Sequence, residues 1–298
     1  MAIKSYKGFD KNLRCRGFQY KIGGIYEMDG KIKMCNRGFH ACESPFDVFD
    51  YYTMIDSRFC EVEQDGNISK EDRGTKICSS KIKIKAELKL ADMINLGVEW
   101  LKEITSPEKI KTSIKDNSSG YGAQIGSSGN GAQIGSSGNG AQIGSSGYGA
   151  KIGSSGYGAK IGSSGYDAKI GSSGYDAKIG SSGNDAQIGS SGYDAQIGSS
   201  GDGAQIGSSG YGAKISSSGY GAKIDSTGED CVIMCAGINS VAKASKGSWV
   251  TLSEWSYSEE KQRYIPICVK TEFVDGEKIK ADTYYSLKGG VFVEWIND

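Results

Sequence analysis

The sequence is nearly devoid of histidine, and it has no long apolar run. His40 is the only histidine among 298 residues, which excludes any catalytic scheme that needs a histidine pair. No segment approaches the ~18 consecutive apolar residues that a membrane-spanning helix needs. The first ten residues also lack the apolar core of a signal peptide. We therefore expect a cytoplasmic protein with no membrane partner.

The chain also has no excess of charge of either sign. Its 35 basic and 35 acidic side chains cancel, so the composition gives no reason to expect a nucleic-acid partner. Its eight cysteines are scattered along a long chain, a distribution that suits reduced thiols better than a disulfide framework. A length of 298 residues allows two or three domains.

The most informative segment is a nine-residue unit that is repeated twelve times, almost without error, between Gly120 and Gly228. The unit reads G-[YND]-[GD]-A-[QK]-I-G-S-S. Alanine recurs at every ninth residue from Ala123 to Ala222, and isoleucine follows two places later, from Ile125 to Ile224. Such uniformity does not suit an active site, because catalysis needs different residues at one place. A fixed period instead indicates units that stack on one another.

Within each unit, one polar residue separates the alanine from the isoleucine. In an extended chain, the alanine and isoleucine therefore face one side, and the Gln or Lys between them faces the other. The glycines and serines supply corners, and each glycine would cost a helix about 1 kcal/mol. The unit thus predicts a β-solenoid with alanine and isoleucine inside. We favour two units per coil, so that the twelve repeats make six coils.

Two units per coil place alternate repeats on the same side of the solenoid. One side then carries a row of tyrosines that is interrupted once, by Asn139. Two interpretations are open: the tyrosines shield a thin core, or they form a contact surface, for which tyrosine is favoured. We predict that the row binds a protein, either a host protein or a second copy of the chain in a homodimer. The predicted contact residues are Tyr121, Tyr157, Tyr175, Tyr193 and Tyr211.

The segments on either side of the repeats read as ordinary globular sequence. Short strands and turns through residues 1–88, followed by a predicted helix at 91–104, indicate an α+β domain. Ser44 and Pro45 predict the start of a further helix, as its cap and its first residue. Predicted strands after the repeats indicate a small C-terminal β domain. The fold is therefore predicted as mainly β, with an N-terminal α+β domain (1–104), a linker (105–119), the solenoid (120–235) and a C-terminal β domain (236–298).

Two metal sites that the residue types suggest lack the right spacing. Cys35, His40 and Cys42, with Cys15 close in space, would make a zinc site, but this spacing matches no standard pattern. The repeat partly resembles a calcium-binding nonapeptide, although most units have glycine at the acidic position. We expect no metal, no cofactor and no catalytic residue. We expect His40 to pack beside buried thiols, and the aspartates to pair with lysines two residues on, as Asp167 with Lys169.

Two other functions of solenoids need residues that the array lacks. Ice-binding surfaces rest on rows of threonine, and Thr227 is the only threonine in the array. DNA mimicry needs an acidic stripe, whereas lysines at the fifth position of the unit offset the aspartates here. Neither function is expected.

Motifs outside the repeats suggest a family. They are YKGFD at 6–10, CRGFQY at 15–20, CNRGFHACESPFDVFDYY at 35–52 and SKIKI at 80–84. Together with the repeats and the SWVTLSEW stretch at 248–255, they resemble an uncharacterised family of bacteriophage and prophage proteins, in which this N-terminal domain commonly precedes Gly/Ser/Ala-rich repeats. The resemblance implies a mobile-element protein expressed inside bacteria. It carries over no activity and no catalytic residue.

These observations favour a non-catalytic binding protein of phage or prophage origin that uses the solenoid as a rigid scaffold. Its most concrete form is an inhibitor of a host defence or regulatory protein. The alternatives are a structural component of the virion and an enzyme with its site in the N-terminal domain. A deep pocket lined by Arg14, Arg16, Arg37 and His40 would favour the enzyme.

Overall fold

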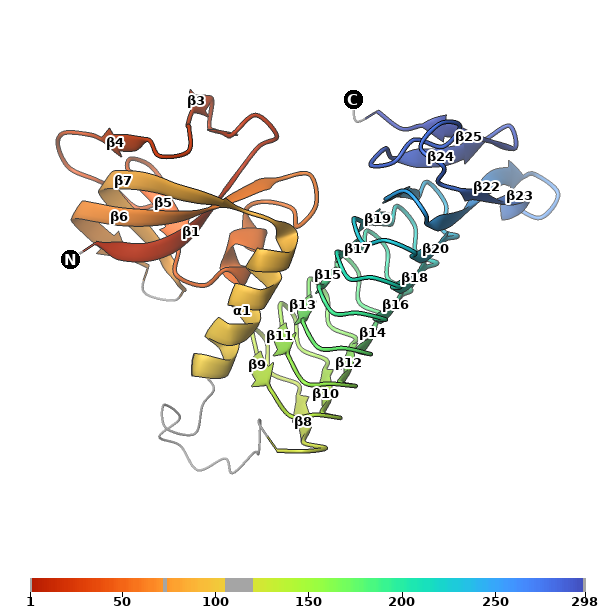
Figure 1. The fold of residues 1–298 in the computed structure, drawn as a ribbon, viewed down its shortest axis with the longest axis horizontal. Helices are drawn as coiled ribbons and strands as arrows, with labels where there is room; N and C mark the ends of the chain where they lie inside the picture. The colour runs from red at the N-terminus through yellow and green to blue at the C-terminus, as the bar shows by residue number, and fades with distance from the viewer. Residues whose placement is uncertain (1, 72–73, 105–119, 297–298) are drawn as a thin grey trace. The chain divides into compact units, whose positions relative to one another are not determined.

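The computed structural model describes residues 2–71, 74–104 and 120–296 (Figure 1). The described chain is mainly β and divides into two compact units, residues 1–100 and 101–298, each with its own core. The predicted linker, 105–119, lies outside the described residues. None of the helices in the described ranges is long and apolar enough to cross a membrane.

The N-terminal unit is built on a small antiparallel sheet. Its strands are β1 (Ile3–Phe9), β4 (Ile25–Glu27), β5 (Phe39–Cys42), β6 (Arg58–Lys70) and β7 (Lys76–Leu88), and β2 (Arg14–Cys15) forms a separate hairpin with β3 (Phe18–Gln19). Strand β7 pairs with β4 and β5 on one side and with β6 on the other. Because β1 pairs with both β5 and β6, the strands β7, β5, β1 and β6 close into a ring. Phe9, Val62 and Ile82 are among the buried residues of this core.

The structure confirms one of the two predicted helices of this unit. Helix α1 (Leu90–Ile104) matches the expected helix and buries Ile94 and Val98. The helix expected after Ser44 is wrong in kind, because the chain forms only a short 3₁₀ helix, η1 (Phe46–Asp50), which no described side chain caps. Asp47 accepts a hydrogen bond from the Thr75 hydroxyl at 2.9 Å instead, so its carboxylate is engaged outside the turn.

In the second unit, each repeat contributes one four-residue strand, and alternate strands join the same parallel sheet. The register pairs identical positions, such as Ile143 with Ile161 and Ile152 with Ile170. Each repeat thus pairs with the repeat that follows two units later in the sequence, which confirms two repeats per coil. The first sheet contains β8 (Gln124–Ser127), β10 (Gln142–Ser145), β12 (Lys160–Ser163), β14 (Lys178–Ser181), β16 (Gln196–Ser199) and β18 (Lys214–Ser217). The second contains β9 (Gln133–Ser136), β11 (Lys151–Ser154), β13 (Lys169–Ser172), β15 (Gln187–Ser190), β17 (Gln205–Ser208) and β19 (Lys223–Ser226).

The two sheets enclose a thin core of alanine and isoleucine. The alanines from Ala141 to Ala222 are at most 1 % exposed, and the isoleucines from Ile143 to Ile224 are at most 3 % exposed. This confirms the predicted inside of the solenoid. Burying one isoleucine side chain contributes about 1.5–3 kcal/mol, so repetition builds a stable core from few residues per coil.

The first glycine of the unit is required because neighbouring coils approach closely at the corners. A Cβ atom on Gly183 would overlap the carbonyl oxygen of Gly165 in the preceding coil. The same overlap would occur between Gly174 and Gly156. Any side chain at this position would push two coils apart, which explains why the repeat keeps glycine there.

The stack continues past the last repeat in non-repetitive sequence. Cys231 and Ile233 occupy the alanine and isoleucine positions of a further coil and are fully buried. The parallel pairing extends to Leu252, and antiparallel hairpins then end both sheets. These strands are β20 (Val232–Cys235), β21 (Val241–Ala244), β22 (Trp249–Ser258), β23 (Arg263–Phe273), β24 (Tyr285–Lys288) and β25 (Val291–Glu294).

Candidate functional site

The five predicted contact tyrosines lie along one edge of the solenoid. Each occupies a turn three residues ahead of a strand of the first sheet, as Tyr175 does ahead of β14. The row therefore follows a corner of the coils, beside the flat sheet. All five are exposed, from 47 % for Tyr211 to 92 % for Tyr121. We call Tyr121, Tyr157, Tyr175, Tyr193 and Tyr211 the tyrosine edge, and Tyr148, Tyr166 and Tyr220, which precede strands of the second sheet, the opposite edge.

Two rings of the tyrosine edge stack along the axis of the solenoid, and a third lies tilted against them. The ring centroids of Tyr175 and Tyr193 are 5.1 Å apart with an angle of 8° between planes, and those of Tyr193 and Tyr211 are 6.2 Å apart with an angle of 41°. These spacings follow from the rise of about 4.8 Å between neighbouring strands of a sheet. Stacked rings on a rigid scaffold have little conformational entropy to lose when a partner binds.

Asn139, which interrupts the tyrosine edge, has a structural role. Its Oδ1 accepts a hydrogen bond at 3.0 Å from the backbone N–H of Tyr157, the equivalent residue of the next coil. Asn130 makes the same contact with Tyr148 on the opposite edge. The second position of the unit is thus filled either by a tyrosine or by an Asn or Asp whose side-chain oxygen accepts from a backbone N–H of the next coil.

Carboxylates hold some of the tyrosine hydroxyls. Tyr157 is hydrogen-bonded to Asp176 of the next coil, and this bond, together with the charge of the carboxylate, raises the pKa of Tyr157. Asp185 raises the pKa of Tyr166 in the same way on the opposite edge. The orientation of these exposed rings is therefore set by the solenoid itself.

The aspartates of the repeats serve the corners of the coils. Asp176 has a φ of 53°, and Gly149, at the equivalent position of another repeat, has a φ of 62°. Glycine and aspartate tolerate this left-handed conformation, which explains why the third position of the unit is Gly or Asp. Lys169 lies 3.6 Å from the Asp167 carboxylate, which confirms that predicted pair. Among the described residues, no group of three or more His, Cys, Asp or Glu is arranged to hold a metal ion.

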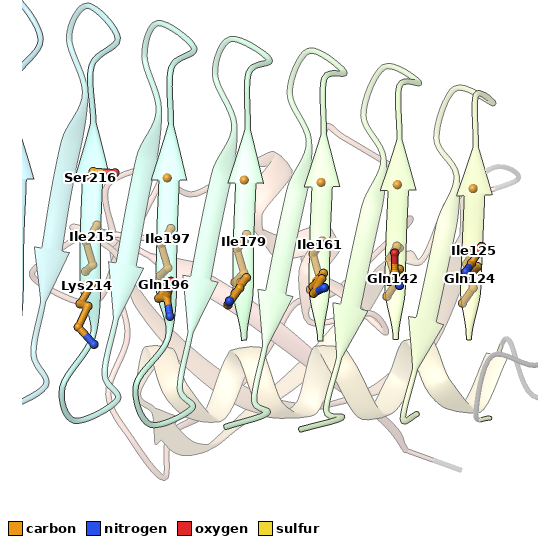
Figure 2. A pocket seen from close by; sticks show the side chains of 18 of the residues that line it. Gln124, Ile125, Gln142, Ile161, Ile179, Gln196, Ile197, Lys214, Ile215 and Ser216 are labelled. Atoms are coloured by element: carbon orange, nitrogen blue, oxygen red, sulfur yellow. The ribbon is translucent and has the colours of Figure 1, made fainter. Parts of the chain in front are cut away.

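A surface that the sequence analysis missed lies on the outer face of the first sheet. A shallow groove of 1190 Å³ crosses its strands from β8 to β20. Figure 2 shows the part of its lining that runs from β8 to β18. The floor of the groove is formed by glycines at the seventh position of the unit, where a Cβ on Gly144, Gly162 or Gly180 would meet no described atom within 4 Å. Figure 2 shows Gln124, Gln142, Gln196 and Lys214 in one row along the groove. We call this surface the glycine groove.

The glycine groove carries basic side chains in part of its length and is apolar at one end. Lys160, Lys178 and Lys214 line it, and no Asp or Glu is among the described residues that do so. Val232 and Met234 line its C-terminal end, and the exposed Trp249 pairs in register with Val232 on the next strand. The surface is suited to a ligand that is acidic in one part and apolar in another.

The tyrosine edge borders the glycine groove. Each of its tyrosines precedes the Gln or Lys of the same repeat by three residues, as Tyr175 precedes Lys178 and Tyr211 precedes Lys214. The two features therefore run side by side along the same coils, and none of the tyrosines is among the residues that line the groove. The signal for the groove was present in the repeat, because a glycine at an outward-facing strand position leaves the sheet without side chains there.

The N-terminal unit contains a pocket of 910 Å³, a volume typical of small-molecule sites. Its lining includes Arg16, Arg37 and His40, three of the four residues whose presence in one deep pocket would favour the enzyme alternative. The fourth, Arg14, lies outside the lining, and its Nε donates a hydrogen bond at 2.9 Å to the side chain of Gln19. We call this cavity the basic pocket.

His40 is engaged by the backbone around it. Its Nε2 accepts a hydrogen bond at 2.9 Å from the N–H of Cys35, and the ring also makes a backbone hydrogen bond with Gly38. Burial, and then the charge of Lys7, lower the pKa of His40, which favours the neutral ring. Burial also raises the pKa of the Cys42 thiol to about 12, so Cys42 stays protonated. This arrangement leaves His40 without a free nitrogen for proton transfer.

Residues 3–96 match a family described as a domain of unknown function, DUF7666. The matched segment carries the YKGFD and CRGFQY motifs and contains the whole lining of the basic pocket. Comparison of the chain with curated proteins and with solved structures gives no match.

Proposed function

We propose that the protein is a non-catalytic binding protein, in which the solenoid is a rigid scaffold and the glycine groove with its tyrosine edge holds a protein partner. One observation carries this proposal. The same coils carry stacked tyrosines along one edge and, beside them, a groove with a floor without side chains and with lysines such as Lys160 and Lys178. Tyrosine is enriched in binding surfaces because it offers contact area at a low entropic cost.

The charge of the groove favours an acidic, extended segment as the bound part of the partner. Lys160 and Lys178 lie on neighbouring strands, and Lys214 lies two strands further along. An acidic segment that crosses the strands would meet all three, and complementary charge also accelerates association. An apolar residue at one end of the segment would contact Val232 and Met234.

The same charges restrict how the chain could bind a second copy of itself. Two glycine grooves in contact about a two-fold axis would bring rows of lysines together, and like charges oppose such a contact. A homodimer, which the tyrosine row predicts, would therefore have to use the tyrosine edge without the groove.

The resemblance of the N-terminal motifs to phage and prophage proteins supports a host protein as the partner. We propose a bacterial defence or regulatory protein, bound in the cytoplasm. A structural component of the virion is the alternative, and its presence in purified particles would distinguish it. The basic pocket favours the enzyme alternative, but His40, the only histidine, is engaged by the backbone, so binding is the better supported role.

Replacing Tyr157, Tyr175 and Tyr193 together with Ser should abolish capture of the partner and leave the fold intact. The side chains are exposed, so their loss removes binding contacts without opening the core. Truncation of an aromatic side chain at the centre of an interface costs about 2 kcal/mol or more. The measurement is affinity capture from a bacterial lysate with identification by mass spectrometry, together with circular dichroism of each variant.

The opposite edge supplies a matched control. Replacing Tyr148, Tyr166 and Tyr220 with Ser removes the same number of exposed rings and should leave capture unchanged. Light scattering of the same samples reports whether either variant changes the mass of the protein in solution. A tyrosine-edge variant that keeps both the wild-type mass and the wild-type partner would show that these rings have only a structural role.

A further inference from the structure

Three cationic side chains of the basic pocket have no acidic partner within the described part of the chain. Lys7, Arg16 and Arg37 line the pocket, and each is hydrogen-bonded only to backbone carbonyls or a thiol among the described residues. Cationic groups that converge on a cavity and outnumber its carboxylates create a positive potential, which attracts anions. The arrangement is independent of the role proposed for the solenoid.

Lys7 is the most unusual of the three because it is only 5 % exposed. Its Nζ donates to the backbone oxygen of His40 at 2.8 Å and lies 3.5 Å from the Cys15 sulfur. An ammonium group has three donors, so one remains for a ligand. Burial lowers the pKa of Lys7, and no carboxylate is among the described groups that offset this. A buried cation without a counter-charge is costly, and a bound anion would remove that cost.

Arg16 and Arg37 are exposed residues of the lining, and both contact backbone carbonyls. Both terminal nitrogens of Arg16 are 3.5 Å from the carbonyl oxygen of Cys35, and Arg37 donates to the carbonyl of Asp29 at 2.6 Å. Arg16 and Cys35 both have a positive φ, of 51° and 61°. Such conformations are unfavourable for these residue types and cluster at ligand-binding sites. Arginine is also well suited to bidentate binding of phosphate oxygens.

The other charges of the pocket are already paired. Lys76 makes an ion pair with Glu71 at 3.4 Å and donates a hydrogen bond to the Tyr51 hydroxyl at 2.9 Å. Glu27, the one acidic residue among the described lining, lies 3.2 Å from Lys81. The unpaired charge is therefore positive and belongs to Lys7, Arg16 and Arg37.

An aromatic wall accompanies these cations. Phe18, Tyr20 and Tyr26 line the pocket, with ring centroids 4.8 Å apart for Phe18 and Tyr20 and 5.0 Å apart for Tyr20 and Tyr26. Phe18 is exposed, so its ring is accessible to a planar group. Aromatic side chains bind nucleobases by stacking, whatever the identity of the base.

We propose that the basic pocket binds a nucleoside diphosphate or a close relative, with the phosphates among Lys7, Arg16 and Arg37 and the ring against Phe18 and its neighbours. The cations account for the phosphates, and the aromatic wall accounts for the planar ring. A volume of 910 Å³ accommodates a ligand of this size.

Isothermal titration calorimetry of the full chain with ADP, pyrophosphate and adenosine tests this site. ADP should bind most tightly, pyrophosphate more weakly, and adenosine at least about tenfold more weakly than ADP, because it lacks the charged groups. Replacing Phe18 with Ala should weaken binding of ADP and leave binding of pyrophosphate unchanged.

Two arginine variants and a matched control test the phosphate contacts. Arg16→Ala and Arg37→Ala should each weaken ADP binding by about tenfold or more. Arg14→Ala removes an arginine two residues from Arg16 that lies outside the pocket, and it should bind ADP like the wild type. Circular dichroism of each variant checks that the fold is retained.

Each possible result of these titrations supports or overturns the proposal that the basic pocket binds a nucleoside diphosphate. Absence of heat with both ADP and pyrophosphate at millimolar concentration would overturn the proposal, as would an equal loss of affinity in Arg14→Ala and Arg16→Ala. Adenosine that binds as tightly as ADP would overturn the phosphate assignment. Pyrophosphate that binds as tightly as ADP would overturn the role of the aromatic wall.

Discussion

Replacing Ile179 with Asp should destabilise the solenoid by about 4 kcal/mol or more. Ile179 lies in the middle of the stack on β14 and is 3 % exposed. The substitution removes buried apolar area and places a carboxylate in a core of alanine and isoleucine, where it has no cationic partner among the described neighbours. Urea denaturation followed by circular dichroism, with hydrogen exchange of the solenoid peptides, measures the loss.

The adjacent residue supplies the control for this variant. Lys178 faces outward on the same strand, and the equivalent position of the next strand of the sheet is Gln196. Lys178→Gln should therefore change the free energy of unfolding by less than about 0.5 kcal/mol. Equal shifts of the unfolding midpoint for Ile179→Asp and Lys178→Gln would contradict the assignment of inside and outside.

The second large effect is expected from a single methyl group at a corner. Gly183→Ala should destabilise the solenoid by about 3 kcal/mol, because the new Cβ overlaps the carbonyl oxygen of Gly165 in the preceding coil. This oxygen belongs to the backbone, so relief of the overlap requires two coils to move apart. The measurement is the same denaturation experiment, with hydrogen exchange to locate the loosened coils.

A glycine three residues away separates this effect from glycine propensity. Gly180 lies on the floor of the glycine groove, where a Cβ would meet no described atom within 4 Å, and Ser216 occupies the corresponding position of β18. Gly180→Ala should be neutral, or it should stabilise by about 0.4–1 kcal/mol by restricting the unfolded chain. A Gly183→Ala variant that is as stable as Gly180→Ala would show that the coils are not in close contact at the corners.

The solenoid is largely predictable from the sequence because its local preferences agree with one another. The alternation of alanine and isoleucine determines the inside of the solenoid. Glycine at the first position permits the close approach of the coils, and Gly or Asp at the third position permits the left-handed conformation seen at Gly149 and Asp176. The period of the repeat determines which residues stack, and the stacking of Tyr175 on Tyr193 follows from it. The side-chain pattern of the repeat did not predict the glycine groove, because the floor of the groove consists of glycines, which have no side chain.

The basic pocket could not be predicted in the same way. Lys7, Arg16 and Arg37 come from β1, from the β2–β3 hairpin and from the turn before β5. They converge because β1 pairs with β5 in the register of Tyr6 with Cys42, a long-range contact that local sequence patterns do not specify. The short 3₁₀ helix after Pro45 illustrates the same limit, because a capping signal was overridden by the contact between Asp47 and Thr75.

Each repeat pairs with the repeat two units later in the sequence, and this pairing determines the core, the tyrosine edge and the glycine groove. Disulfide trapping tests it most directly. Gly162 and Gly180 face each other on neighbouring strands, and strand neighbours about 4.8 Å apart are within the range for a disulfide. After mild oxidation of the double variant Gly162→Cys, Gly180→Cys, tryptic mass spectrometry should find the peptides of these two residues joined. The variant Gly162→Cys, Gly171→Cys, which pairs successive repeats on opposite sheets, should form no such bond. A bond in the second variant and none in the first would contradict the two-repeat coil.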